Sequence, residues 1–327
     1  SYSVTGVQTC ALPIFAITNL VLMFLFVNNV LSDRNSSKTT GVVSSFSHES
    51  STPTYNSEAQ SSIDPVISEN PTSFDFPGSE IPLFILSIYV DQKPQIYAFH
   101  PEGIPFTRLI EEPYEEIHPT VSHDGSKIAY SAKKNGYWDV YILDLNDGSE
   151  LRVTDSPEYD GSPTWSSDDL YIAYESYANG NMDIFIQDLQ NLDNEPIQLT
   201  NGFEPQFSPS WSADGRKIAF VSTVDGDEEI WLAKLDTIED RFMKVADRPK
   251  QIDTNPHWSS DGEKLLWTSE SYGYPRIIQA DFSDPNILVS EVMIGDSALL
   301  TENLISYIQL EANQNFLISK NQTGKLL

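Results

Sequence analysis

The chain has 327 residues, of which 39% are hydrophobic, with 48 acidic against 19 basic residues and a formal net charge of -29. This acidic balance excludes the basic footprint that nucleic acids and anionic membrane surfaces require. A single cysteine, Cys10, excludes a disulfide framework and a thiolate metal site.

The first segment, residues 1–14, does not resemble a natural protein sequence. Val4 to Ile14 resembles an in-frame translation of a sequencing-library adapter, and a segment of that origin would take no part in the fold. We therefore interpret residues 1–14, including Cys10, as adapter-derived, with a natural leader of the same sequence as the alternative.

Residues 15–31 read FAITNLVLMFLFVNNVL and carry no charge. This length lies at the short end of the roughly 17–25 residues that a membrane-spanning helix needs. We predict a membrane-anchor helix that tethers an extracytoplasmic domain, with a cleaved signal peptide and a buried core strand as alternatives.

The segment 32–74 is rich in Ser, Thr, Asn and Pro and poor in large apolar residues. Such a segment cannot bury enough surface to offset its chain entropy, so we predict a disordered linker. Residues 75–327 are enough for one large β domain.

Within this domain, residues 208–232 form a template that recurs, SPSWSADGRKIAFVSTVDGDEEIWL. The residue before a proline avoids the right-handed helical region, which predicts an extended segment up to Trp211. Asp214-Gly215 predicts a tight turn, and β-rich runs follow at 217–222 and 230–232. Strand, turn, strand, turn and strand at this spacing predict a β-meander.

Four clear copies carry the prolines Pro119, Pro163, Pro209 and Pro256, which are 44, 46 and 47 residues apart. A β-rich repeat of roughly 40–50 residues is typical of a propeller blade. Weaker copies begin near residues 83 and 295. We therefore predict an all-β fold, a six-bladed β-propeller of four-stranded blades. The repeats lie near 83–117, 118–161, 162–207, 208–254, 255–294 and 295–327, the last of them incomplete.

Two sets of recurring residues are predicted to be structural. Trp165, Trp211 and Trp258 are expected on inner strands or between blades, and replacing Trp211 by alanine should cost about 3–5 kcal/mol. The acidic-glycine turns are expected to bond backbone amides instead of doing chemistry. These turn residues are Asp124, Gly125, Asp168, Asp214, Gly215, Asp261 and Gly262.

The copies resemble the TolB-type propeller repeat, a relative of the WD repeat that also occurs in tricorn-like and prolyl-oligopeptidase-like proteins. The Trp-Ser pairs that begin at Trp165, Trp211 and Trp258, with the Asp-Gly turns, carry this resemblance. In place of the family's proline before Asp-Gly, the four copies have His123, Ser167, Ala213 and Ser260. The resemblance implies the architecture and, through TolB, a partner in the cell envelope, whereas propellers as a class host many activities.

The sequence contains no Gly-x-Ser-x-Gly, His-Glu-x-x-His, Walker or Gly-x-Gly-x-x-Gly motif. We therefore assign no catalytic, cofactor-binding or metal residue, and expect no cofactor. His118 and His257 flank the repeat prolines, so they are candidates for one face of the ring. Ordinary strand-end histidines are the preferred interpretation, and a metal site is the alternative.

Loops after the second strand differ between the copies, and variable loops on a rigid frame are typical of recognition surfaces. We predict a non-catalytic, membrane-tethered, extracytoplasmic propeller that binds an envelope protein or a small ligand on one ring face or at the central mouth. The alternative is the substrate-gating propeller of a prolyl-oligopeptidase-like serine peptidase.

Overall fold

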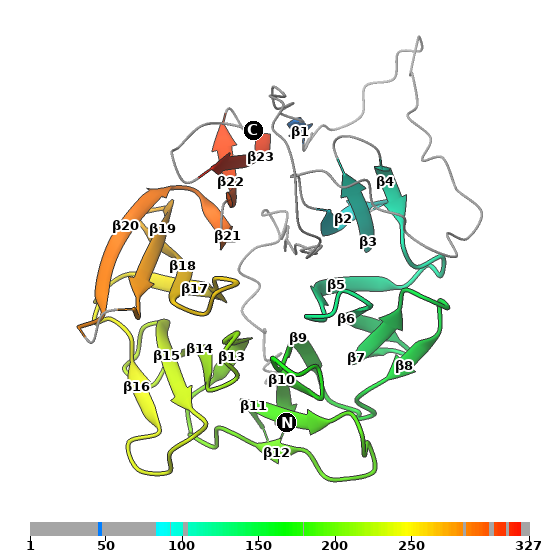
Figure 1. The fold of residues 1–327 in the computed structure, drawn as a ribbon, viewed down its shortest axis with the longest axis horizontal. Coiled ribbons are helices and arrows are strands. Elements are labelled where there is room, and N and C mark those ends of the chain that lie inside the picture. Colours follow the sequence, from blue (N-terminus) through cyan, green and yellow to red (C-terminus); the bar gives the residue numbers. More distant parts are fainter. Residues whose placement is uncertain are drawn as a thin grey trace, which may run out of the picture.

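The computed structural model describes residues 45–47, 83–91, 93–100, 104–178, 180–283, 286–300, 304–311 and 314–321. These residues form six small antiparallel sheets around a central axis (Figure 1), which confirms the predicted all-β, six-bladed propeller. The predicted membrane-anchor helix at 15–31 lies outside the described residues.

The first three blades use strands β2 to β12. Blade 1 has β2 (Phe84–Val90), β3 (Lys93–His100) and β4 (Ile104–Arg108). Blade 2 has β5 (Glu115–Val121), β6 (Lys127–Lys134), β7 (Tyr137–Asp144) and β8 (Glu150–Arg152). Blade 3 has β9 (Asp160–Trp165), β10 (Tyr171–Ala178), β11 (Asn181–Asp188) and β12 (Ile197–Gln198).

The other three blades complete the ring. Blade 4 has β13 (Gln206–Trp211), β14 (Lys217–Ser222), β15 (Glu229–Lys234) and β16 (Phe242–Lys244). Blade 5 has β17 (Ile252–Trp258), β18 (Lys264–Ser271), β19 (Tyr274–Asp281) and β20 (Leu288–Ile294). Blade 6 has β21 (Asp296–Leu300), β22 (Leu304–Glu311) and β23 (Gln314–Asn321), with β1 (Ser45–Ser47) as its fourth strand.

In blades 2 to 5 the strands lie side by side in chain order, with the first strand nearest the axis and the fourth at the rim (Figure 1). The inner strands β5, β9, β13, β17 and β21 contact one another around the axis.

Blade 6 takes its outer strand from the other end of the sequence. Ser45, Phe46 and Ser47 pair antiparallel with residues 314–316 of β23. In the sequence, these three residues belong to the predicted linker 32–74.

Six hydrophobic clusters hold the ring together, and each joins two neighbouring blades. Blades 1 and 6 are joined by Phe84 and Leu86 of β2, which pack with Leu299 and Ile308 of blade 6. Because each sheet is covered on both faces, its second strand is buried at consecutive positions, as at 128–132. The continuous apolar runs of the repeat follow from this packing.

The residue before each repeat proline departs from the expected extended conformation. His118, Ser162, Ser208 and Asn255 have positive φ values of 53°, 49°, 53° and 53°. The pairing register of each inner strand shifts at this point, as a β-bulge requires. Proline disfavours the right-handed helical region for its predecessor, but here that residue occupies the left-handed region and not the extended one.

In blades 3 and 4, a contact with the preceding blade holds the amide group of the bulge. The Ser162 amide donates to Ser131 Oγ of blade 2 at 3.0 Å, and the Ser208 amide donates to Glu175 Oε2 of blade 3 at 2.6 Å. In blades 3 and 4 the bulge therefore joins two blades, and the contact offsets the cost of a non-glycine residue at positive φ.

The Ser-x-Asp-Gly turns share one hydrogen-bond pattern. In blade 4, the Ser212 hydroxyl donates to Asp214 Oδ1 at 2.5 Å, and the same oxygen accepts the Arg216 amide at 3.0 Å. In blade 3, the Ser166 hydroxyl donates to Asp168 at 2.6 Å, which holds the pKa of that carboxyl below its usual range. The carboxylates of Asp124 and Asp261 accept equivalent bonds.

Blade 3 has Asp169 where the other clear copies have glycine, and its φ is 57°. Its carboxylate accepts the amides of His123 at 2.8 Å and Asp124 at 3.0 Å, both from blade 2. The strain of a side chain at this position is thus offset by two hydrogen bonds between blades.

Gly215→Ala is expected to destabilise the protein more than Gly226→Ala. Both glycines have positive φ, which costs an alanine about 1–2 kcal/mol. A Cβ at Gly215 would also lie 2.5 Å from Ser167 Oγ, whereas nothing lies within 4 Å at Gly226. Urea unfolding of both variants measures the difference, and Ser167→Ala combined with Gly215→Ala should recover part of it. Equal losses at the two positions would show that the turn does not contact Ser167.

Candidate functional site

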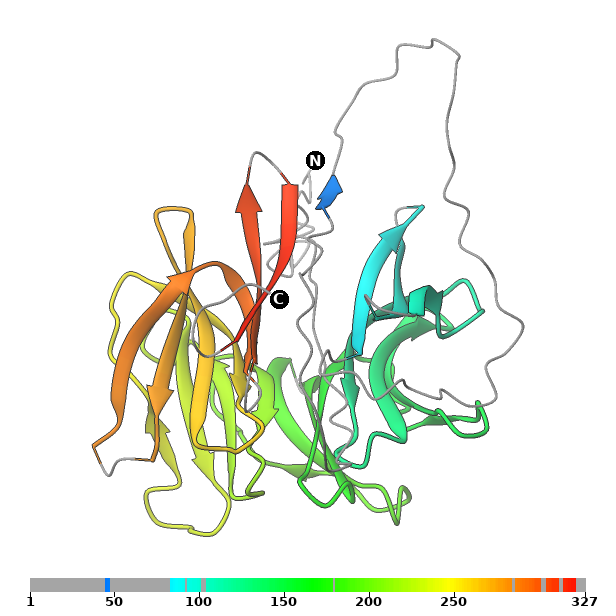
Figure 2. The same ribbon diagram turned by 45° about the horizontal axis from the view of Figure 1, so that its top comes forward.

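The ring has two faces of different composition. The hairpin face carries the hairpins between second and third strands, together with the connections that lead into the inner strands. The turn face carries the Asp-Gly turns and the connections between third and fourth strands. Figure 2 shows the β2–β3 and β18–β19 hairpins at the top of the ring and the β15–β16 connection at its bottom.

Among the described residues, exposed apolar side chains are more numerous on the hairpin face than on the turn face. Tyr272, at the tip of the blade 5 hairpin, is 96% exposed, and Phe203 is fully exposed. Large apolar side chains that are exposed on this face are Tyr89, Tyr137, Phe203, Val224, Ile252, Tyr272 and Tyr274. On the turn face, the described residues of this kind are Leu170 and Ile238. The others lie on the outer strands of blades 2 to 5.

Hydrogen bonds tie the loop of Phe203 to the neighbouring hairpin. The Asn181 side chain, at the start of β11, donates to the Gly202 carbonyl at 3.0 Å and to the Glu204 carbonyl at 3.3 Å. The β10–β11 hairpin and the connection into β13 are therefore joined on this face.

A cavity of about 260 Å³ lies at the turn-face end of the axis, lined by the inner strands of blades 2 to 6. Trp165, Trp211, Trp258 and His257 line it together with Thr120, Thr164, Ser210 and residues of the adjoining turns. This volume is below the roughly 300–1,000 Å³ of small-molecule pockets. The geometry therefore favours a structural role for this cavity.

The predicted structural tryptophans lie at the ends of the inner strands. Trp165 and Trp258 are buried between blades, whereas Trp211 is half-buried beside the cavity. The Trp165 indole Nε1 donates to the Thr120 carbonyl of blade 2 at 3.0 Å. The Trp211 indole instead donates to the Gly215 carbonyl of its own turn at 3.2 Å.

His257 occupies the position that other blades fill with a hydroxyl. Thr164 and Ser210, at this position, accept the amides of the next blade's tryptophans, Trp211 at 3.1 Å and Trp258 at 3.4 Å. Burial lowers the pKa of His257 to about 4, so its imidazole is neutral at neutral pH.

The structure does not bring His118 and His257 into one site. His257 lines the cavity, whereas His118 Nδ1 lies 3.0 Å from Ser162 Oγ in the wall between blades 2 and 3. Burial lowers the pKa of His118, an effect that Glu175 opposes. The described residues contain no group of three or more His, Cys, Asp or Glu side chains able to hold a metal ion.

The His118 contact belongs to a hydrogen-bond network centred on Glu175. Its Oε1 accepts the Ser162 and Tyr159 hydroxyls, each at 2.9 Å, while its Oε2 accepts the Ser208 amide. Since the single Ser162 hydroxyl proton goes to Glu175, His118 must donate its Nδ1 proton to Ser162. In a serine triad the carboxylate orients the histidine, but here it holds the serine. The arrangement links blades 2, 3 and 4.

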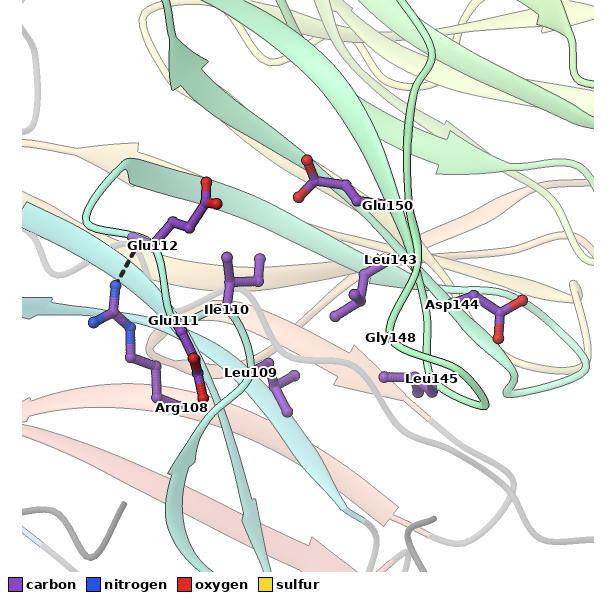
Figure 3. Close-up of a pocket in the computed structure, with 10 residues that line it drawn as sticks. All are labelled: Arg108, Leu109, Ile110, Glu111, Glu112, Leu143, Asp144, Leu145, Gly148 and Glu150. Carbon is purple, nitrogen blue, oxygen red and sulfur yellow. Dashed lines mark hydrogen bonds between the residues drawn. The ribbon is translucent and has the colours of Figure 1, made fainter. Parts of the chain in front are cut away.

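A second hollow, the lateral cleft, has a volume of about 340 Å³ and lies between blades 1 and 2. Its walls are residues 108–112, which begin at the last residue of β4, and the β7–β8 region, 143–150 (Figure 3). Ile110 and Leu143 face each other across it, and the carboxyl groups of Glu112 and Glu150 lie on the same side of them (Figure 3). This cleft could not be predicted from the sequence, because its two walls come from different repeats.

Several groups near the lateral cleft are already bonded. Arg108 Nη2 donates to the Glu112 carbonyl at 2.7 Å, and Glu150 accepts hydrogen bonds from Lys134 and Tyr130. The Lys134 ammonium also lies over the Tyr141 ring, 4.3 Å from its centroid. The side-chain carboxylate of Glu112 is exposed and makes no ion pair with a described residue.

Glu116 is a fully buried carboxyl group on the inner strand of blade 2. Burial raises its pKa to about 7, although the Ile96 amide, Arg108 and Lys134 favour the charged form. Its Oε1 has no hydrogen-bond partner among the described residues. At neutral pH this carboxyl is therefore near its titration midpoint.

Glu116→Gln should remove a pH dependence of stability. The folded pKa of about 7 exceeds the ordinary value of 4.5, so the stability that Glu116 contributes is full below pH 4.5 and is lost as the pH rises through 7. The difference between these two pKa values corresponds to a change in the free energy of unfolding on the order of 3 kcal/mol. Urea unfolding from pH 4.5 to 8 should show the wild type falling relative to the variant. Parallel curves would contradict a raised pKa.

Comparisons with known proteins agree with this architecture. A family model described as TolB beta propeller domain matches residues 153–323. The structure of putative TolB from Agrobacterium tumefaciens is similar at 22% identity, with a TM-score of 0.55 over 68% of this chain and 81% of that one. TolB from Acinetobacter baumannii has 18% identity and a TM-score of 0.59, over 74% of this chain and 58% of that one.

Peptidases are also among the similar structures. A puromycin-hydrolyzing peptidase of Mycobacterium tuberculosis has 12% identity and a TM-score of 0.56, over 77% of this chain and 44% of that one. At such identities the likeness concerns the propeller fold alone. No curated protein matches the sequence. In the part of the chain that the structure describes, no helix is long and apolar enough to span a membrane.

Proposed function

Because the chain belongs to the TolB β-propeller domain family, we propose that it is a non-catalytic binding module that docks a protein partner of the cell envelope on its hairpin face. It works outside the cytoplasm and is tethered to the membrane through residues 15–31, as their apolar sequence suggests.

The observation that carries this proposal is the difference between the two faces. Tyr272 at 96% and Tyr274 at 68% exposure stand on one hairpin, and Tyr89 and Tyr137 stand on the hairpins of blades 1 and 2. Tyrosine is enriched in protein interfaces because it offers a large apolar ring and a hydroxyl at little entropic cost. Exposed aromatic groups around a rigid ring suit a broad protein surface better than a small ligand.

The His118–Ser162–Glu175 network supports a binding role over a hydrolytic one. Ser162 is buried and holds its proton toward Glu175, so His118 cannot remove that proton as a general base. Within the part of the chain that the structure describes, the pair that resembles a nucleophile and a base therefore serves to join blades.

Site-specific photo-crosslinking in the cell envelope tests this proposal. A photoreactive amino acid at Tyr272 or Phe203 should give a discrete protein adduct, and the same group at Ile238, 88% exposed on the turn face, is the matched control. Adducts only from Ile238, or from none of the three positions, would reject the hairpin face as the docking surface.

A further inference from the structure

The lateral cleft between blades 1 and 2 combines an apolar floor with acidic groups on one side. Leu109, Ile110, Leu143 and Leu145 supply the apolar surface, and these residues extend the core between the two blades. The volume of the cleft, about 340 Å³, is at the lower end of the range for ligand pockets. This size suits a single long side chain.

The charged residues that line the cleft favour a positively charged side chain. Its lining includes four acidic residues, Glu111, Glu112, Asp144 and Glu150, against one basic residue, Arg108. Glu150 is engaged by Lys134, and Asp144 lies 3.8 Å from the Lys127 ammonium and points away from the cleft (Figure 3). The Glu112 carboxylate, on the same side as Glu150, remains for an incoming cation.

We propose that the lateral cleft binds a basic side chain, arginine or lysine, presented by an extended segment of a partner protein. The alkyl stem packs between Ile110 and Leu143, and the cationic head lies beside Glu112 and Glu150. Long basic side chains combine these two properties, since their stems bury on apolar surface while the charge stays near water. The overall net charge of -29 favours the approach of such a basic partner.

This inference is independent of the hairpin face. The cleft is formed by the end of β4, the residues that follow it and the β7–β8 region, and none of the apolar residues assigned to the hairpin face line it. A partner that docks on the hairpin face without using the cleft would leave the proposed function intact and would not bear on the cleft.

The test uses N-acetyl-arginine methylamide as the probe and the isoleucine and leucine methyl NMR signals of the full chain as the readout. The methyl signals of Ile110 and Leu143 should shift in a saturable way, with a dissociation constant on the order of millimolar. The neutral analogue N-acetyl-norleucine methylamide should bind more weakly by roughly three-fold or more. Equal affinities of the two probes, or no shift at Ile110 and Leu143, would overturn the proposal.

Two variants at adjacent positions test whether Glu112 binds the cationic group of the probe. Glu112→Gln should weaken arginine binding by roughly two- to five-fold, as expected for an exposed ion pair. Glu111→Gln makes the same change of charge one residue away, at a carboxyl on the other side of Ile110 (Figure 3), and should change binding less. Both side chains are exposed, so both variants should fold. Equal effects would mean that the acidic surface attracts the probe without a defined site.

Discussion

Trp165→Ala is expected to destabilise the protein by about 3–5 kcal/mol, the cost of truncating a large buried aromatic side chain. Trp165 is 2% exposed and packs between blades 2 and 3 with Ile142, Ile172 and Tyr174. Its indole Nε1 also donates to the Thr120 carbonyl of blade 2, so the variant loses a hydrogen bond between blades as well as the packing.

Trp211→Ala serves as the internal control, because Trp211 occupies the same position of the repeat. It is half-buried, and its indole donates to its own turn and not to another blade, so its loss should be smaller by at least about 1 kcal/mol. The stability loss expected for Trp211→Ala is therefore lower than the about 3–5 kcal/mol expected from the sequence alone. Urea unfolding followed by circular dichroism measures both variants, and an equal or larger loss for Trp211 would contradict the packing described here.

Glu175→Ala is expected to cost about 2–4 kcal/mol, because it leaves buried donors without an acceptor. The Ser208 amide has the least freedom to adjust, since it belongs to the bulge of blade 4 and points at Glu175 Oε2. The Ser162 hydroxyl can turn toward His118, and the Tyr159 hydroxyl loses its acceptor.

Glu158→Ala is the matched control, because Glu158 is an exposed acid next to Tyr159. Its expected effect is within about 0.5 kcal/mol. Hydrogen exchange adds a local measurement, since the Ser208 amide should lose protection in Glu175→Ala before the blade cores do. A variant as stable as the wild type would mean that Glu175 does not link the blades.

The repeat explains why the fold could be predicted from the sequence. Trp-Ser, Asp-Gly and an apolar run recur at an almost constant spacing, and each copy specifies the same local structure. The inner-strand position of Trp165 and the turn position of Asp214 follow from local sequence. The positive φ of Ser162 and Ser208 could not be predicted, since it depends on acceptors in the preceding blade, Ser131 and Glu175.

Features that join distant segments were also missed. The pairing of Ser45–Ser47 with β23 links opposite ends of the chain, and no local pattern in three residues predicts it. The lateral cleft needs segments from two repeats, at Ile110 and Leu143, whose separation depends on how neighbouring blades pack. His118 and His257 occupy neighbouring positions of the repeat, one before and one after its proline. Their side chains have different surroundings, since His118 contacts Ser162 and His257 lines the cavity.

Hydrogen–deuterium exchange of the full chain, with and without the partner that crosslinking captures, tests the hairpin face most directly. We expect the bound partner to protect the hairpins at 89–93, 135–137 and 272–274 from exchange. Exchange in the Asp-Gly turns near Asp124, Asp214 and Asp261 should be unchanged. Protection confined to those turns and to the neighbouring cavity would contradict this expectation and would place partner binding on the opposite face of the ring.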